Sequence, residues 1–201
     1  MDQSEELIII DAVKNGDKDA FEKLLIDNQK KVYNIALRMV GNPEDALDMS
    51  QEAFLKAYMS ISGFRGESRF SVWLYRLTTN VCLDFLRRES KRSHASLTYP
   101  EDEDREFEIP DHRFSPQSEV ERSELHEALK RGLDQLPDDF RAILVLREIG
   151  GLSYCEIGET LSLEEGTVKS RIFRARKKLC LILETDRNFP YQNASKTESE
   201  V

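Results

Sequence analysis

The chain has few cysteines and histidines, and their spacing excludes several kinds of site. Cys82, Cys155 and Cys180 are the only cysteines in 201 residues, and they lie far apart beside apolar neighbours. A disulfide framework needs more cysteines at closer spacing, so we expect reduced thiols, as in a cytoplasmic protein. The three histidines share no metal-ligand spacing with them, and we therefore expect no metal and no other cofactor.

Long apolar runs and catalytic motifs are also missing. No apolar run approaches the roughly 20 residues that cross a membrane. The N-terminus carries Asp2, Glu5 and Glu6 where a secretory signal would carry cations. We therefore expect no membrane insertion and no signal peptide. The sequence contains no Gly-rich phosphate loop and no convergent Ser/His/Asp or Cys/His pattern, so it does not indicate an enzyme.

Strand patterns are scarce, whereas apolar residues recur at helical spacing along most of the chain. The pattern predicts helices in two groups, separated by a stretch without periodicity. The expected helices cover residues 4–15, 17–40, 43–61, 69–92, a segment from 121, 140–149, 153–161 and a segment from 164. The fold class that follows is all-α.

A sharp change in composition separates the two groups of helices. Residues 95–120 contain three prolines and eight acidic residues against two arginines. This composition predicts an acidic flexible linker. We therefore expect two small helical domains, at residues 1–94 and 121–184, followed by a polar tail at 185–201.

The C-terminal group includes a predicted helix-turn-helix over residues 151–179. Ser153 and Glu156 have the spacing of a capping box at the start of its first helix. Ser162 falls in the turn, and the second helix begins near Glu164. Such a second helix fits the major groove of DNA, where polar and arginine side chains reach base edges.

Positive charge is concentrated in two segments of an otherwise acidic chain, whose net charge is −9. Residues 164–178 contain six Lys/Arg against two Glu, and residues 65–94 contain seven against three. Local cations in an acidic protein indicate two contact patches for a polyanion. The alternative is a solvated helix face whose cations pair with neighbouring acids.

Longer motifs resemble one protein family. The segments DALDMSQEAFLKAY and GFRGESRFSVWLYRLTTNVCLDFLRR resemble the region 2 domain of bacterial sigma factors. The segments LPDDFRAILVLREIGGLSYCEIGETL and EEGTVKSRIFRARKKL resemble their region 4 domain. With two domains and a short linker, the chain is similar to the extracytoplasmic-function (ECF) group of the sigma-70 family. Leu47 and Ser162 depart from the family pattern, which often has an acidic residue and a turn glycine there.

The resemblance implies a specificity subunit of RNA polymerase without a catalytic site of its own. Such a protein binds core RNA polymerase, recognises the −35 and −10 elements of promoter DNA and helps to open the duplex. The resemblance also implies two contacts with core polymerase. One is with the clamp of the largest subunit, and the other, through part of residues 140–149, is with the flap of the second-largest subunit. An anti-sigma factor is a further partner common in this group.

The same resemblance assigns residues to three surfaces. At the −35 element these are Thr167, Lys169, Ser170, Arg171, Arg174, Arg176, Lys177 and Lys178. At the −10 element they are Phe64, Ser68, Phe70, Arg76, Asn80, Arg87, Arg88, Lys91 and Arg92. The surface for core polymerase comprises Asp45, Asp48, Gln51 and Glu52.

Some of these assignments have plainer alternatives. Phe64 is expected to be an exposed stacking surface for a base, but it could instead pack under its loop. Asn80 can read a base edge, or it can cap a local backbone group. The acidic face of residues 45–52 could simply be solvated. A conventional transcription regulator is the nearest rival function, although such regulators often carry a receiver domain with strands, which this sequence does not predict.

Overall fold

The computed structural model describes residues 3–95 and 116–186, and all regular structure within these ranges is helical. The N-terminal half contains α1 (Gln3–Lys14), α2 (Lys18–Val40), α3 (Pro43–Ser60), a 3₁₀ turn (Ile61–Gly63) and α4 (Phe70–Ala95). The C-terminal half contains α5 (Pro116–Asp134), α6 (Asp138–Glu148), α7 (Tyr154–Leu161) and α8 (Glu165–Thr185). The predicted all-α class is confirmed.

Local sequence signals explain where the helices of the first half begin and end. The Asp17 carboxylate accepts hydrogen bonds from the amides of Asp19 and Ala20 and so caps α2. Gly41 ends α2 with a φ of 79°, a conformation that only glycine adopts without strain. Asn42 then caps α3, whose first residue is Pro43.

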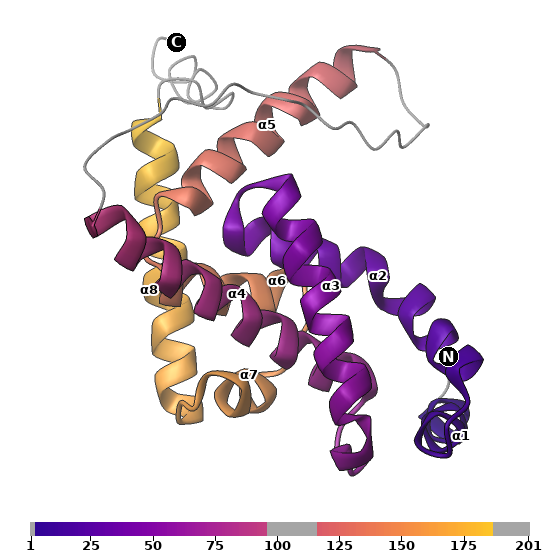
Figure 1. Ribbon diagram of the computed structural model, residues 1–201. Helices are drawn as coiled ribbons and strands as arrows, with labels where there is room; N and C mark the ends of the chain where they lie inside the picture. The colour runs from indigo at the N-terminus through magenta and orange to yellow at the C-terminus, as the bar shows by residue number, and fades with distance from the viewer. Residues whose placement is uncertain (1–2, 96–115, 187–201) are drawn as a thin grey trace, which may run out of the picture.

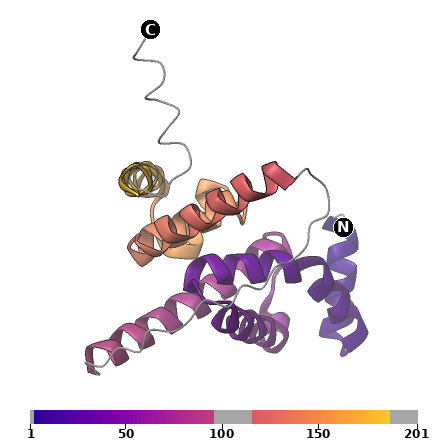
Figure 2. The same cartoon turned by 90° about the horizontal axis from the view of Figure 1, so that it is seen from above.

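The two halves are built from packed helices and meet each other. Helices α2, α3 and α4 pack together, and α1 lies across one end of α2 (Figure 1). In the second half, α8 is a long helix along one side of the molecule, with α5, α6 and α7 against it (Figure 1). Seen from above, the C-terminal part of α4 extends beyond α2 and α3 (Figure 2).

Helix α6 joins the halves because it packs against α2. Arg141 on α6 is only 8% exposed, and its guanidinium donates to the carbonyl of Met39 in the last turn of α2 at 2.7 Å. It also donates to the carbonyls of Asp134 and Leu136 at 3.2 Å. A cation is favourable at a helix C-terminus, where carbonyl groups lack partners within the helix.

The predicted helices match the structure closely, with differences at their ends. Helix α5 begins at Pro116, inside the predicted linker, whereas the sequence pattern predicted a start near residue 121. Helix α4 continues to Ala95, past the expected end near Arg92. Most of the predicted linker and of the predicted tail, residues 96–115 and 187–201, lies outside the described residues.

Candidate nucleic-acid interface

The predicted helix-turn-helix is formed by α7 and α8. Ser153 and Glu156 form the expected capping box at the start of α7. Ser162 ends α7 in the left-handed region with a φ of 55°, which explains why this turn position suits glycine. Gly158 lets the chain turn tightly, because a Cβ there would lie 2.6 Å from the carbonyl oxygen of Leu163.

One side of α8 is buried and the other is exposed. Val168, Ile172 and Ala175 pack into the core, as their spacing predicted. Ser170 and Arg174 are exposed and lie one turn apart, with the Arg174 guanidinium 3.3 Å from the Ser170 carbonyl and hydroxyl oxygens. The other exposed cations of α8 are Lys169, Arg176, Lys177 and Lys178. This face can present polar atoms to base edges and cations to phosphates.

Several predicted residues of α8 already have partners within the protein; among them, Lys169 pairs with Glu165 at 3.0 Å. Arg171 is half-buried, and its guanidinium pairs with Asp139 of α6 at 3.4 Å. Arg176 forms an ion pair with Glu148 of α6. Thr167 is half-buried, and its carbonyl accepts a hydrogen bond from Ser170 at 3.0 Å. Of the central arginines, Arg174 therefore has the freest access to DNA.

Phe173 is a further candidate for the DNA-facing surface, although the sequence argument did not select it. Its side chain is 70% exposed, directly beside Arg174. Phenylalanine can contact the methyl group of thymine in the major groove. The sequence could have indicated its exposure, because Phe173 lies three residues after Ser170 and outside the buried stripe of Val168, Ile172 and Ala175.

The loop before α4 differs from the predicted stacking surface. Phe64 is only 4% exposed, and its ring lies 5.2 Å from Trp73 and 6.1 Å from Phe70, which is fully buried. The prediction of an exposed Phe64 is therefore wrong, because three aromatic rings form a cluster beneath the loop. Phe64 and Phe70 therefore support the loop by packing beneath it, and a base cannot stack on their buried rings. The half-buried Ser68 remains at its surface.

Helix α1 fixes this loop from outside. The Lys14 ammonium donates to the carbonyl of Phe64 at 2.8 Å. The Glu6 carboxylate accepts a hydrogen bond from the amide of Phe70 at 2.7 Å and so caps α4. The loop is therefore held at both ends by side chains from a helix fifty or more residues away in the sequence.

The exposed face of α4 carries most of the other predicted −10 residues. Arg76 and Asn80 are exposed one turn apart, and Arg76 has no ion-pair partner among residues 3–95 and 116–186. Arg87 pairs with Asp84 at 3.1 Å, and Arg92 pairs with Glu89 at 3.0 Å. The remaining exposed cations of this stretch are Arg88 and Lys91. Within residues 3–95 and 116–186 the Asn80 side chain caps no backbone group, and it is exposed to solvent.

The predicted polymerase-binding residues of α3 divide between two sides of the helix. Asp45 is half-buried beside α4, and its pKa is raised by burial and by the nearby Glu89, Asp48 and Glu44. Glu52 pairs with Lys56 at 2.8 Å, whereas Asp48 is exposed. Gln51 lies on the other side of α3, where it lines a cavity.

That cavity lies between α2 and α3 and has a volume of about 640 Å³. Its lining includes Leu25, Tyr33 and Phe54, together with Leu47, which is 52% exposed. Leu47, which stands where the family often has an acidic residue, therefore extends the apolar lining of this cavity. An apolar hollow rimmed by polar residues is typical of a protein-binding site.

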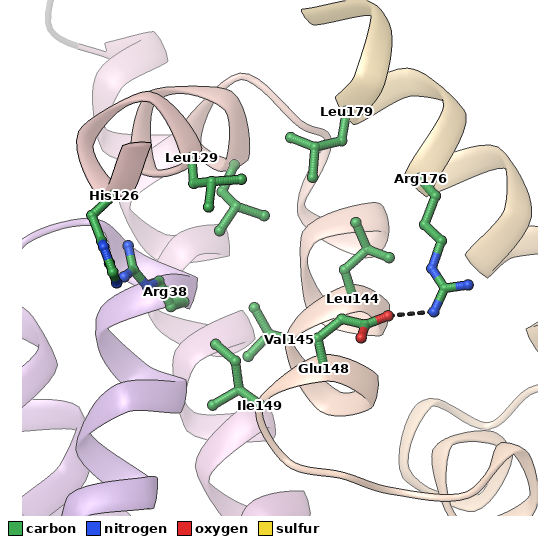
Figure 3. Close-up of a pocket in the computed structure, with 10 residues that line it drawn as sticks. Arg38, His126, Leu129, Leu144, Val145, Glu148, Ile149, Arg176 and Leu179 are labelled. Carbon is green, nitrogen blue, oxygen red and sulfur yellow. Dashed lines mark hydrogen bonds and ion pairs between the residues drawn. The ribbon is translucent and has the colours of Figure 1, made fainter. Parts of the chain in front are cut away.

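A second apolar cavity, of about 570 Å³, lies where α5, α6 and α8 meet (Figure 3). Leu144 and Val145 of α6 and Ile149, which directly follows α6, line it, and Arg38 of α2 lies beside His126 (Figure 3). The ion pair between Glu148 and Arg176 closes another edge. Part of the apolar surface of α6 therefore faces this cavity, while α6 also packs against α2 and α8.

Comparisons with known proteins agree with this architecture. Residues 24–92 match the Sigma-70 region 2 family and residues 126–179 match the Sigma-70, region 4 family. The RNA polymerase sigma-H factor of Pseudomonas aeruginosa is 38% identical over 179 residues, which is 87% of this chain and 92% of that protein. The ECF RNA polymerase sigma factor SigW of Bacillus subtilis is 37% identical over 172 residues, which is 85% of this chain and 92% of SigW.

Solved structures show the same fold. The sigma factor RpoE of Bartonella quintana, in complex with the anti-sigma factor NepR, has a TM-score of 0.66 and 22% identity, and the match covers 83% of this chain and 98% of that chain. CnrH, in complex with the cytosolic domain of CnrY, has a TM-score of 0.64 and 23% identity, and the match covers 90% of this chain and 98% of CnrH. The identity to its relatives over most of both chains, with both domains in order, shows that this chain belongs to the ECF group of the sigma-70 family of RNA polymerase sigma factors.

Proposed function

We propose that this sigma factor recognises the −35 element with the exposed face of α8 and one separated strand of the −10 element with α4 and its preceding loop. Members of this family are non-catalytic specificity subunits that direct core RNA polymerase to promoters. The observation that carries the assignment is the face of α8 that bears Ser170, Phe173 and Arg174 between exposed lysines. We assign these functions to two units, residues 1–94 and 121–184, joined by the acidic segment 95–120.

At the −35 element, Arg174 is the side chain best placed for base contact. Ser170 is hydrogen-bonded to Arg174 and can share a base edge with it. Lys177 and Lys178 follow one turn later and suit phosphates. Arg171 and Arg176 are held by acidic residues of α6, so their contribution to DNA affinity requires these ion pairs to open.

At the −10 element, Asn80 offers a donor and an acceptor from one amide. Arg76 lies one turn before it and the cations near the end of α4 lie beyond it, so the strand backbone can follow this face. A base can be read in this way only after it has left the duplex stack. Ser68 supplies a hydroxyl at the neighbouring loop.

Core polymerase is proposed to bind at two places. The exposed Asp48 and the cavity between α2 and α3 fit a clamp helix that carries both cations and apolar groups. The cavity beside α6 fits an apolar segment of the flap. We also propose that an anti-sigma factor regulates this protein, as NepR binds the similar Bartonella sigma factor.

The site of action is proposed to be the cytoplasm, and the protein is proposed to have no catalytic centre of its own. Among the described residues, no helix combines the length and apolar character that crossing a membrane requires.

The assignments can be tested with a promoter library randomised through both elements and transcribed by the assembled holoenzyme. We expect Arg174→Ala to relax the preference at −35 positions alone and Asn80→Ala to relax it at one −10 position. Lys130→Ala removes an exposed cation of α5, a helix that carries none of the residues assigned to either element, and is the control. Unchanged preferences in both variants would show that these residues do not read the promoter.

A further inference from the structure

Helix α1 holds both ends of the loop before α4, which comprises residues 64–69. Lys14 donates to the Phe64 carbonyl at 2.8 Å, and Glu6 accepts from the Phe70 amide at 2.7 Å. Glu6 and Lys14 are eight residues apart, which places them on the same side of α1 and about 12 Å apart along its axis. Among the residues that the structure describes, no other hydrogen bond joins residues 64–70 to α1, α2 or α3.

The middle of the loop also lies against α1. Gly66 is half-buried and has a φ of 75°, a conformation that favours glycine. A Cβ at this position would lie 3.1 Å from Cδ2 of Leu7, so the backbone approaches α1 more closely than a larger residue would comfortably allow. The loop is therefore shaped against α1 at its two ends and at its centre.

The two polar contacts are separate from the apolar contacts that hold α1 and the loop in the fold. Ile10 and Val13 of α1 are buried, at 1% and 5% exposure, and α1 packs against α2. The loop rests on the aromatic cluster of Phe64, Phe70 and Trp73. The hydrogen bonds of Glu6 and Lys14 therefore determine where the loop backbone lies rather than whether the chain folds.

The position of the loop backbone matters because the loop carries groups proposed to meet a base. Ser68 lies two residues before Phe70, whose amide Glu6 holds, and its side chain is half-buried. A group that reads a base must be held to within about 0.5 Å, and a loop reaches this precision only when neighbouring residues fix it. Helix α1 supplies that support.

We propose that α1 is a specificity element for the −10 strand, in which Glu6 and Lys14 are positioning residues. They hold the loop where its backbone and Ser68 meet the same unstacked base as Asn80, and each acts only through the loop. This inference rests on the proposed function, because α4 and its loop must already read the base. Helix α1 precedes residues 24–92, which match the region 2 family, so the proposal assigns promoter selectivity to residues outside that segment.

The test is transcription by the assembled holoenzyme from a promoter library randomised through the −10 element. Lys14→Met removes the ammonium and keeps an apolar stem, Glu6→Ala removes the carboxylate, and Lys14→Arg restores a donor. Lys18→Met makes the same change at an exposed lysine of α2 that forms no hydrogen bond or ion pair within the described residues, and is the matched control. Asn80→Ala marks the position that the proposed function assigns to base reading.

Lys14→Met and Glu6→Ala are each expected to reduce the base preference about three- to tenfold at the position that Asn80→Ala relaxes, which is the effect of one lost hydrogen bond. Preferences elsewhere in the −10 element should stay the same, and Lys14→Arg and Lys18→Met should select promoters as wild type does. Lys14→Met combined with Ser68→Ala should relax the preference no further than the larger single change, because Lys14 acts through the loop that carries Ser68.

An even loss of transcription across all −10 sequences in Lys14→Met and Glu6→Ala would show that these residues only stabilise the fold, and would overturn the inference. If Asn80→Ala relaxes one position and both α1 variants keep the wild-type preferences, the inference is wrong and the proposed function stands. If wild type shows no base preference in the −10 element, the proposed function fails and the inference fails with it.

Discussion

Replacing Arg141 with methionine tests the contact that joins the two halves of the molecule. Methionine keeps much of the length and apolar packing of arginine and removes the guanidinium. That group donates to carbonyls on α2, at the end of α5 and in the turn before α6, and it lies 3.5 Å from the Asp138 carboxylate. Arg141→Met therefore leaves three backbone carbonyls without this donor.

The expected loss follows from two opposing contributions. Each buried carbonyl left unsatisfied costs about 1–3 kcal/mol. Against this, the variant no longer buries a cation, nor the Nε of Arg141, which is buried without a partner among the described residues. We expect a net loss of about 2–4 kcal/mol in the free energy of unfolding, which corresponds to a fall in Tm of roughly 5–15 °C for a chain of this size.

Urea unfolding followed by circular dichroism measures this loss. Arg87→Ala is the control, since Arg87 is exposed and its pair with Asp84 should contribute less than about 1 kcal/mol. A stability for Arg141→Met within about 0.5 kcal/mol of wild type would refute the reasoning, because it would mean that the three carbonyls find water or other donors at no cost.

The remaining predictions concern single sites. Ser162→Gly should raise the free energy of unfolding by about 1 kcal/mol in the same urea experiment, because Ser162 has a positive φ; no gain would mean that the turn is unstrained. Asp48→Arg should weaken binding to core polymerase in a titration without changing the circular dichroism spectrum, and equal affinity would exclude this surface. At pH 8 a thiol reagent should modify the exposed Cys155 and Cys180 but leave Cys82, since burial raises the pKa of Cys82 to about 12. Equal reaction of all three thiols in the native protein would contradict this. Because the folded pKa of Cys82 lies above its ordinary value of 9.0, the contribution of its neutral thiol to the free energy of unfolding should be complete below pH 9 and lost as the pH rises toward 12.

Features set by neighbouring residues could be predicted from the sequence. The caps at Asp17, Asn42 and Ser153 and the stop at Gly41 depend on side chains within a few positions of the helix end. The buried stripe of α8 follows from helical spacing. The exposed positions of Asn80 and Arg174 follow from the same spacing, because they fall outside the buried stripes.

Features set by distant residues could not be predicted in this way. The pair of Arg171 with Asp139 joins residues 32 positions apart, and the bond from Arg141 to Met39 joins residues 102 apart. Phe64 looks exposed in a loop of glycines and charges, yet Trp73 and Phe70 cover it. The hold of α1 on the loop before α4 joins residues fifty or more positions apart, so no single segment indicates it.

Run-off transcription with purified core polymerase shows whether this chain directs initiation at promoters only as part of a holoenzyme. A template library with natural promoters is transcribed by core enzyme alone, by the chain alone and by both together. We expect discrete transcripts only when both are present, and DNase protection of the promoters only in their joint presence. Protection of duplex DNA by the chain alone, with transcripts no different from those of core enzyme, would contradict it and would indicate a conventional DNA-binding regulator.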